Sequence, residues 1–315
     1  MKTKFKNLLA FCLLLGSMFI FTPSFAKSPV RVTIKSSKDQ PEVERLIRQI
    51  LPMTAVRRVE FVSRYLNGRK YRPETKKRIK KQRDKKIEKR EATNTEPLKV
   101  EFLRTSMEFL DCMTYVEHVL AIASCQKPDY SKDFLPRLLD IMFDAGGKPL
   151  LSHLRNHFTS VWADKNEKKG YLVNIARNHK LAKTRTLTLN QVGKNRTYYV
   201  EDRFMISEKP QTIWFFDRET LLSKKFRPDS GDVLAMVTDK EGLDVTHMGF
   251  YIKKAGKHLL RHASYTLNRV VDQDFYDYLR EHKSVKGLMV LRPVLKASTP
   301  AKYNFENEKK LRNKK

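Results

Sequence analysis

The strongest constraint on the fold is an apolar segment that starts at Leu110-Asp111-Cys112-Met113 and continues to Ala123. Its apolar residues recur close to the helical period, which predicts a buried helix from Thr114 onward. Asp111 stands just before this segment and is a favourable N-cap residue. Because a buried helix needs neighbours on every side, the rest of the chain is expected to pack around it.

Cys112 lies in the first turn of this predicted helix. The positive end of the helix dipole favours the thiolate, which is the nucleophilic form of cysteine. Cys112 is therefore a candidate nucleophile, and the rest of the chain would have to supply a base and an orienting group. The alternative is that Cys112 is a small, buried, apolar residue, and this segment alone does not decide between the two.

Residues 1–26 have the pattern of a secretory signal peptide. Lys2, Lys4 and Lys6 precede an apolar run from Leu8 to Phe21, and Ser24-Phe25-Ala26 offers small residues for cleavage after Ala26. The run is short for a membrane span, and no other segment could cross a membrane. We therefore expect an exported mature protein without a transmembrane helix, in the periplasm, in the cell envelope or secreted.

Two cysteines, Cys112 and Cys125, remain after removal of the signal peptide. If one helix runs from Cys112 to Cys125, the two lie about 20 Å apart along its axis. A disulfide needs Cα atoms within roughly 7 Å, so the two cannot pair. The sequence predicts a free Cys112 and a structural thiol at Cys125.

The formal net charge of the 315-residue chain is +29. The excess is concentrated between Arg69 and Arg90 and in the tail from Lys302 to Lys315. In an exported protein such segments favour anionic envelope surfaces as partners, and no nucleic acid is expected because aromatic residues are not interleaved with the charges. A solvated basic insertion without a ligand is the alternative.

These patterns divide the chain into five parts. After the signal peptide, residues 27–66 form a helical segment with two predicted helices, one after Pro41 and one after Pro52. Residues 67–97 form a basic insertion or linker, and residues 98–295 form the catalytic domain. Residues 296–315 are expected to be a basic, disordered tail.

A segment rich in polar and aromatic residues extends from Arg155 to Asn166 and contains Trp162. His153 and His157 have a helical metal-ligand spacing, but no acidic residue or cysteine accompanies them in a recognisable pattern, so no metal site is expected. The segment is typical of a substrate-binding loop or of a hydrogen-bonded scaffold, and the sequence leaves both open.

Buried strands are predicted at Val233–Val237, Val245–Ile252 and His258–Ser264. If the last two form a hairpin centred on Ala255-Gly256, His247 lies opposite Ser264, and His262 is the diagonal neighbour on the same face. Two histidines on one face could serve as base and orienter for a nearby thiolate.

Four separated motifs now suggest a family. The segment from Leu110 to Glu117 resembles the nucleophile motif of the NlpC/P60 cell-wall hydrolases, in particular their N-acetylmuramoyl-L-alanine amidase-like branch. Gly231-Asp232-Val233, the segment from Gly242 to Phe250 and His262-Ala263-Ser264 are similar to later motifs of this branch, in the same order. The resemblance covers about residues 60 to 295.

The resemblance implies an α+β fold with a papain-like core, in which the helix bearing the nucleophile packs on an antiparallel sheet beside an N-terminal helical layer. It implies that Cys112 is the nucleophile and His247 the general base, and it selects His262 over Ser264 as the residue that orients the base. The implied candidates for substrate binding are Tyr71, Asp111, Glu117, Arg155, Trp162, Asn166 and Ser264. No cofactor is implied.

The implied activity is hydrolysis of the amide between N-acetylmuramic acid and L-alanine, in peptidoglycan or in muropeptides, through a thiol-acyl intermediate. The alternatives are cleavage between D-glutamate and the diamino acid, a papain-like protease, and a basic envelope-binding protein. One departure from the family pattern is the basic insertion Lys76 to Arg90, which separates Tyr71 from the nucleophile motif.

Overall fold

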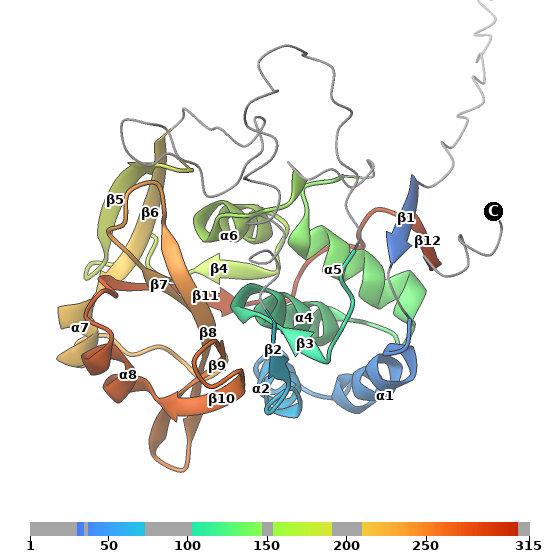
Figure 1. Ribbon diagram of the computed structural model, residues 1–315, viewed down its shortest axis with the longest axis horizontal. Coiled ribbons are helices and arrows are strands. Elements are labelled where there is room, and N and C mark those ends of the chain that lie inside the picture. The colour runs from blue at the N-terminus through green and yellow to red at the C-terminus, as the bar shows by residue number, and fades with distance from the viewer. Residues whose placement is uncertain (1–29, 35–36, 73–102, 147–153, 191–209, 308–315) are drawn as a thin grey trace, which may run out of the picture.

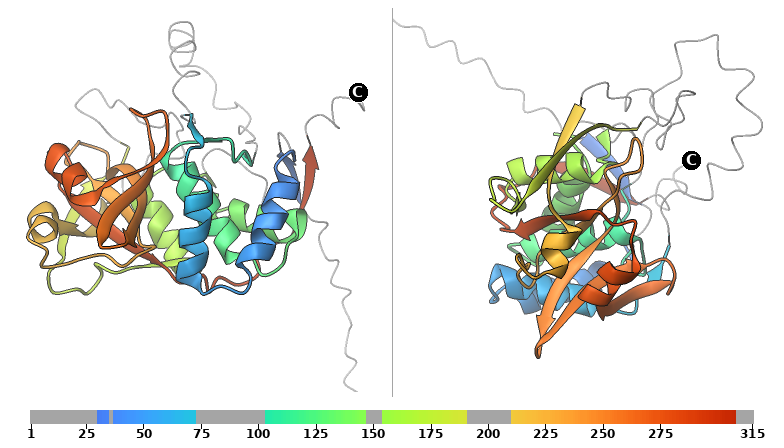
Figure 2. Two further views of the ribbon diagram at one scale, coloured as in Figure 1. Left: turned by 90° about the horizontal axis from the view of Figure 1, so that it is seen from below. Right: turned by 90° about the vertical axis from the view of Figure 1, so that its left-hand side faces the viewer.

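The computed structural model describes residues 30–34, 37–72, 103–146, 154–190 and 210–307. The predicted signal peptide, the basic segment Lys76 to Arg90, and His153 lie outside the described residues. The described chain is an α+β structure with seven α-helices and a large mixed sheet, which confirms the predicted class. Figures 1 and 2 show the helices gathered on one side of that sheet, except for two short helices on the other.

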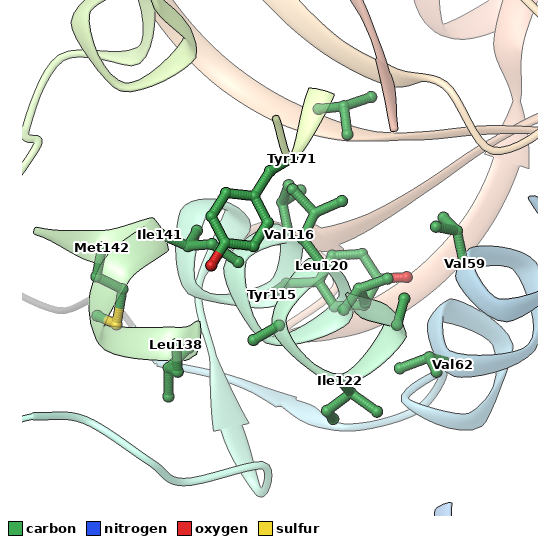
Figure 3. Packing of buried hydrophobic residues seen from close by; sticks show 14 of the residues in the cluster. Val59, Val62, Tyr115, Val116, Leu120, Ile122, Leu138, Ile141, Met142 and Tyr171 are labelled. Atoms are coloured by element: carbon green, nitrogen blue, oxygen red, sulfur yellow. The ribbon is translucent and has the colours of Figure 1, made fainter. Parts of the chain in front are cut away.

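The predicted central helix is α4 (Cys112–Ser124), and it begins two residues earlier than expected. Every residue from Thr114 to Ser124 is buried, because helices cover α4 on two sides and the sheet covers a third. Figure 3 shows its apolar side chains between α2 (Ala55–Tyr65) and α5 (Leu135–Met142). A single π-helical turn, Tyr130–Phe134, leads into α5.

The N-terminal helical layer consists of α1 (Gln40–Ile50) and α2, both of which pack on α4. As predicted, α1 starts with a proline in its first turn and buries the apolar face that contains Leu46 and Ile47. Arg58 of α2 donates hydrogen bonds to the carbonyl oxygens of Ala123 (3.3 Å) and Cys125 (3.0 Å). A guanidinium at this end of α4 satisfies carbonyls that have no partner within the helix.

The large sheet has the strand order β3-β2-β10-β9-β8-β7-β11-β6-β5, and β4 pairs with β11. All pairs are antiparallel except β2 with β3. The strands are β2 (Lys70–Tyr71), β3 (Phe109–Leu110), β4 (Leu172–Asn174), β5 (Lys183–Thr188), β6 (Pro210–Asp217), β7 (Val233–Val237), β8 (Val245–Lys254), β9 (Lys257–Ser264), β10 (Arg269–Asp274) and β11 (Gly287–Pro293). The three strands predicted from the sequence are β7, β8 and β9.

The two faces of the sheet carry separate cores. Val233, Phe250 and Ala263 face the helices α2 and α4, and α6 (Thr159–Lys168) lies at the end near β4. Residues of opposite parity, such as Leu234 and Leu260, face α7 (Arg218–Leu222) and α8 (Phe275–Glu281). This alternation follows from the two-residue repeat of a strand, and it puts His247 and His262 on the α8 face.

Two buried aspartates fix the starts of the central strands. Asp232 accepts hydrogen bonds from Arg292 Nε (2.9 Å) and from its terminal nitrogen (3.0 Å). Asp244 accepts from the backbone N–H of Ser160 at 2.6 Å, which ties the first turn of α6 to β8. The motifs around residues 231 and 244 therefore have a structural role.

The expected disordered tail is wrong for residues 303–307. Tyr303–Asn307 forms β12, which pairs in parallel with β1 (Val30–Ile34). The alternation in Tyr303-Asn304-Phe305-Glu306 explains this strand: Tyr303 is buried and Phe305 packs against the core, while Glu306 lies 3.6 Å from Arg31. The basic composition of the tail led to the prediction of disorder, although residues 303–307 form a short strand with one apolar face.

Candidate active site

Cys112 is the first residue of α4, and a capping box fixes this start. Asp111 Oδ1 accepts from the backbone N–H of Thr114 at 2.8 Å, and Thr114 Oγ1 accepts from the N–H of Asp111 at 2.8 Å. The prediction that Asp111 is the N-cap is confirmed. The Asp111 carboxylate is engaged with the helix backbone, so this residue positions Cys112 at the exposed end of an otherwise buried helix.

The sulfur of Cys112 lies beside the backbone N–H groups of Met113 and Met248 and its own N–H. Burial and, to a smaller extent, the negative charge of Asp111 raise the pKa of the thiol to about 12, and these N–H groups oppose the rise. The helix start favours the thiolate, but desolvation outweighs this preference in the free protein. Cys112 holds a neutral thiol until a base removes its proton.

His247 of β8 and His262 of β9 lie side by side next to Met248. His247 Nε2 is 2.6 Å from His262 Nδ1, and the ring planes are nearly perpendicular, with centroids 4.8 Å apart. On its other side, His262 Nε2 is 2.6 Å from Gln273 Oε1 of β10. The structure thus brings the predicted base and its predicted orienter together, and it adds a third polar group that the sequence did not reveal.

The hairpin has the predicted two-residue loop: Lys254 pairs with Lys257, and both Ala255 and Gly256 have positive φ. The β8–β9 pairs end at Phe250–Arg261, after which His247 pairs with Met236 of β7 and His262 with Val271 of β10. The continuous pairing of β8 with β9 thus stops before His247 and Ser264, which the hairpin geometry had placed opposite each other.

Gly249 lies next to the last of these pairs. A Cβ atom at Gly249 would lie 2.7 Å from the Arg261 carbonyl oxygen and 2.7 Å from His262 Cβ. The absence of a side chain therefore lets β9 approach closely enough for the two imidazoles to meet.

Both imidazoles are neutral at pH 7. Burial, and to a smaller extent the neighbouring His262 and His282, lower the pKa of His247 to about 3. Burial also lowers the pKa of His262, against the hydrogen bond to Gln273, which favours the protonated ring. A neutral imidazole can accept a proton from a neutral thiol, whereas an imidazolium cannot.

Aromatic rings surround the thiol. Tyr278 of α8 stacks on His282 with centroids 4.0 Å apart, and it contacts His262 edge-to-face at 5.4 Å. Burial and the nearby Cys112 raise the pKa of Tyr278 to about 12, and they also raise the pKa of Tyr71 well above its ordinary value. Tyr71 meets the ring of Tyr265, which is 68% exposed, at 5.6 Å.

Tyr71 is thus beside the thiol, even though the basic insertion separates the two in sequence. Sequence reasoning missed four neighbours of the site: Gln273, Tyr278, His282 and Tyr265. The only sequence signal for Gln273 is its alternation with Val271 on the strand after the hairpin.

Glu117 and Arg155 form a buried ion pair with each other. The guanidinium nitrogens lie 2.6 Å and 2.8 Å from the two carboxylate oxygens, and one also donates to the Met142 carbonyl at 2.9 Å. Glu117 is completely buried and Arg155 nearly so. The pair ties α4 to the chain between α5 and α6, so the structure gives both residues a scaffold position in place of the expected substrate contact.

Trp162 and Asn166 of α6 are also completely buried. Asn166 Nδ2 donates to the carbonyl oxygens of Ile141 (3.1 Å) and Trp162 (2.9 Å). Of the two possibilities for the segment from Arg155 to Asn166, the structure favours the hydrogen-bonded scaffold. A direct substrate contact by Trp162 or Asn166 is not compatible with this burial.

Ser264 is buried at the end of β9, where its Oγ accepts from the N–H of Leu267 at 3.2 Å. It therefore holds the turn that carries Tyr265. Cys112 and Cys125 are both free, as predicted, at opposite ends of α4.

Within the described ranges, no group of three or more His, Cys, Asp or Glu side chains could hold a metal ion. None of the helices described is both long and apolar enough to span a membrane.

Comparison with known proteins adds a family match and a fold match. Residues 62–287 match the family model described as N-acetylmuramoyl-L-alanine amidase-like. A Legionella pneumophila protein of the DUF1460 family superposes with a TM-score of 0.61 at 19% identity, over 85% of this chain and 97% of the other. An N-acetylmuramoyl-L-alanine amidase from Bacteroides uniformis gives 0.58 at 21% identity, over 76% and 98%.

A putative xylanase from Bacteroides fragilis has the same fold, with a TM-score of 0.53 at 24% identity over 73% of this chain and 98% of the other. No curated protein sequence matches the chain. Likeness at these identities establishes a shared fold, and the family match covers most of the chain.

Proposed function

Because its residues 62–287 match the family model, the chain belongs to the N-acetylmuramoyl-L-alanine amidase-like family, and from this premise we propose that it is a cysteine amidase acting on peptidoglycan or muropeptides. The bond it hydrolyses is the amide between N-acetylmuramic acid and L-alanine. Cys112 is the nucleophile, His247 the general base and His262 the residue that orients the base. The amidase from Bacteroides uniformis, which shares the fold, supports this substrate class.

One observation carries the proposal: the thiol at the start of α4 lies beside the backbone N–H of Met248, the residue that follows His247 in β8, and His247 is paired with His262. This order of groups (nucleophile, base, orienter) is the arrangement that activates a thiol or hydroxyl in acyl-transfer enzymes. A structural cysteine has no need of such neighbours. The core is proposed to be papain-like, of the NlpC/P60 type.

The reaction follows from the protonation states. The Cys112 sulfur attacks the lactyl carbonyl carbon of the muramic acid as its proton passes to His247. The C–N bond then breaks, the proton moves from His247 to the leaving nitrogen, and a stem peptide beginning with L-alanine departs. Water, deprotonated by His247, hydrolyses the remaining thioester and frees Cys112.

Backbone donors are available for the negative charge that develops on the carbonyl oxygen. The backbone N–H groups of Cys112 and Met248 lie near the sulfur. When the sulfur moves toward the substrate, these donors can stabilise the oxyanion, a contribution worth about 3–4 kcal/mol per donor in related chemistry.

We propose that the mature protein is exported to the periplasm or cell envelope, or secreted. The basis is the sequence pattern of residues 1–26, with its basic start, apolar run and small residues at the cleavage positions. Export would bring the enzyme to its polymeric substrate.

Digestion of defined muropeptides, followed by mass spectrometry, tests the proposal. The wild type should release stem peptide beginning with L-alanine. The Cys112→Ala variant should release none, and the matched variant Cys125→Ala at the other end of α4 should keep the activity. Cleavage between D-glutamate and the diamino acid would show that the scissile bond lies within the stem peptide. Hydrolysis of casein but of no muropeptide would favour a protease.

A second candidate function, binding to an anionic envelope surface, is favoured by a basic groove. The groove has a volume of about 360 Å³, and it lies between α2 and the tip of the β8–β9 hairpin. Arg57, Arg64, Lys253 and Lys254 line it, and its one acidic lining residue, Glu60, accepts a hydrogen bond from Ser230. Among the described residues, none of these four cations has a carboxylate partner.

This groove is separate from the thiol. Lys253 is six residues along β8 from His247, or about 20 Å at the rise of a strand. We infer that the groove holds an anionic polymer or head group while the thiol acts on peptidoglycan. The basic segments outside the described residues would add to this attraction.

Co-sedimentation with anionic vesicles tests the second function. The double variant Lys253→Gln/Lys254→Gln should bind severalfold more weakly at low salt, whereas Lys127→Gln/Lys132→Gln, which removes two exposed lysines elsewhere, should bind like the wild type. Both should cleave small muropeptides normally. Equal losses in the two double variants would show that only net charge matters, and would refute a site at the groove.

A further inference from the structure

Gln273, His262 and His247 form a continuous row of polar side chains, and His247 precedes Met248, whose backbone N–H lies beside the Cys112 thiol. Gln273 comes from β10, His262 from β9 and His247 from β8, so the row crosses three neighbouring strands on the face covered by α8. We propose that Gln273 is a positioning residue that sets the tautomers of both histidines and so leaves His247 Nδ1 unprotonated, as a base for the Cys112 thiol requires. The inference rests on the proposed function only for its kinetic consequence.

The order of donors and acceptors follows from the fixed role of one atom. Gln273 Oε1 is a carbonyl oxygen and can only accept, so His262 Nε2, at 2.6 Å, must carry the proton. A neutral ring holds one N–H, which leaves His262 Nδ1 with a lone pair. The nitrogen 2.6 Å from that lone pair is His247 Nε2, which must therefore donate. His247 Nδ1 remains as the acceptor.

This logic requires that each ring carries a single proton. Both histidines are buried, and burial lowers the pKa of each. A second proton on either ring would place a charge in an apolar setting beside His282. The rings therefore stay neutral, and one choice of tautomer determines the next.

The opposite orientation of the Gln273 amide would reverse every bond in the row. An NH₂ group facing His262 Nε2 would move the proton of His262 to Nδ1, and His247 Nε2 would have to accept. The single proton of His247 would then lie on Nδ1, and because Nε2 already accepts from His262, the ring would have no lone pair left to take the thiol proton. Whether the Gln273 side chain presents its oxygen or its nitrogen to His262 thus decides whether His247 can act as a base.

The packing holds the rings in the geometry that the row needs. Tyr278 meets His262 edge-to-face at 5.4 Å, and His247 and His262 are nearly perpendicular. Gly249 leaves the space into which His262 Cβ fits. The antiparallel register, with Leu260 opposite Gln273 and Val271 opposite His262, sets Gln273 diagonal to His262. Ring rotation cannot exchange the nitrogens without breaking these contacts.

Nitrogen-15 NMR of histidine-labelled protein tests the inference without substrate. The protein has eight histidines, and spectra of His247→Gln and His262→Gln assign the two signals. We expect protonated Nε2 and bare Nδ1 for both rings in the wild type. Protonated Nδ1 on either ring would overturn the proposal, whatever the enzyme hydrolyses.

Two variants then test the role of Gln273 itself. Gln273→Glu keeps an oxygen acceptor and should preserve both tautomers, whereas Gln273→Met, of equal length, removes the acceptor and should give His262 a mixture of tautomers. The matched control Lys257→Met, at the exposed start of β9, should leave the tautomers unchanged. Unchanged tautomers in Gln273→Met would also overturn the proposal.

The rate of muropeptide hydrolysis tests the role of Gln273 independently of the NMR spectra. Gln273→Met should lower kcat on muropeptides by roughly tenfold, as is usual for groups that orient a functional histidine, with little change in KM, and Gln273→Glu should restore most of the rate. Equal losses in both variants would show a merely structural role. If the wild type cleaves no muropeptide, the proposed function fails, but the NMR result still stands.

Discussion

The Glu117–Arg155 pair allows a decisive test of scaffold against substrate binding. Replacing Glu117 by Ala leaves the Arg155 guanidinium buried without the carboxylate that now accepts two hydrogen bonds from it, at 2.6 Å and 2.8 Å. Removing one partner of a buried pair costs about 3–5 kcal/mol, because the remaining charge loses its compensation. At about 2–4 °C per kcal/mol, Tm should fall by roughly 6–20 °C.

Urea and thermal unfolding measure this loss, and muropeptide kinetics well below the transition measure KM for the folded fraction. We expect a large loss of stability with KM nearly unchanged. The double variant Glu117→Leu/Arg155→Met should recover much of the stability, since it removes both charges. Lys165→Met, which breaks the partly exposed pair with Asp144, should cost no more than about 1 kcal/mol.

The reasoning would be refuted by a Glu117→Ala variant that melts like the wild type but has a greatly raised KM. That result would return Glu117 and Arg155 to the substrate site, as the sequence resemblance had implied. A variant that loses both stability and substrate affinity at low temperature would refute the separation of scaffold and site.

Three further predictions concern the thiol and its imidazole neighbours. Because the pKa of the Cys112 thiol is raised to about 12, its alkylation by iodoacetamide at pH 7 should be slower than that of a free cysteine. The alkylation rate should rise about tenfold per pH unit up to pH 10. A rate independent of pH would indicate a thiolate–imidazolium pair. Gly249→Ala should lower kcat on the order of 100-fold, since its Cβ pushes β9 and His262 away, and an unchanged kcat would contradict this. The unfolded His247 binds a proton below about pH 6.5, whereas the folded one stays neutral down to about pH 3. The free energy of unfolding should therefore fall as the pH drops through this window, by up to about 1.4 kcal/mol per pH unit. In the His247→Gln variant, the free energy of unfolding measured with urea should depend less steeply on pH.

Helix α4 and the β8–β9 hairpin were predictable because local rules specify them. Asp111 caps the helix through its own side chain, and the two-residue loop at Ala255-Gly256 fixes which residues face each other. From these two elements alone, the sequence predicted a helix-start thiol and two histidines on one face. It did not predict that they meet, since that depends on packing.

The protonation state of Cys112 was beyond the sequence for the same reason. The helix dipole is a local property and favours the thiolate. Desolvation depends on what covers the helix end, and here the sheet, Tyr278 and Tyr71 surround the sulfur. Since burial opposes charge more strongly than one helix terminus favours it, the sign of the pKa shift reversed once the fold was known.

The buried polar residues show the same limit of sequence-based prediction, because composition alone does not distinguish a binding loop from a scaffold. A guanidinium, an indole and an amide between Arg155 and Asn166 are typical of a binding loop, and they are equally typical of a buried scaffold. Glu117 and Arg155 decide between these only through the 2.6 Å contact that joins them across 38 residues of sequence. Burial of a charge is tolerated when a partner compensates it, so the presence of each residue in the core explains the presence of the other. A substrate carboxylate or ammonium would have to displace that partner, and for this reason we propose that recognition falls to the half-buried ring of Tyr71 and the exposed ring of Tyr265, which contact each other.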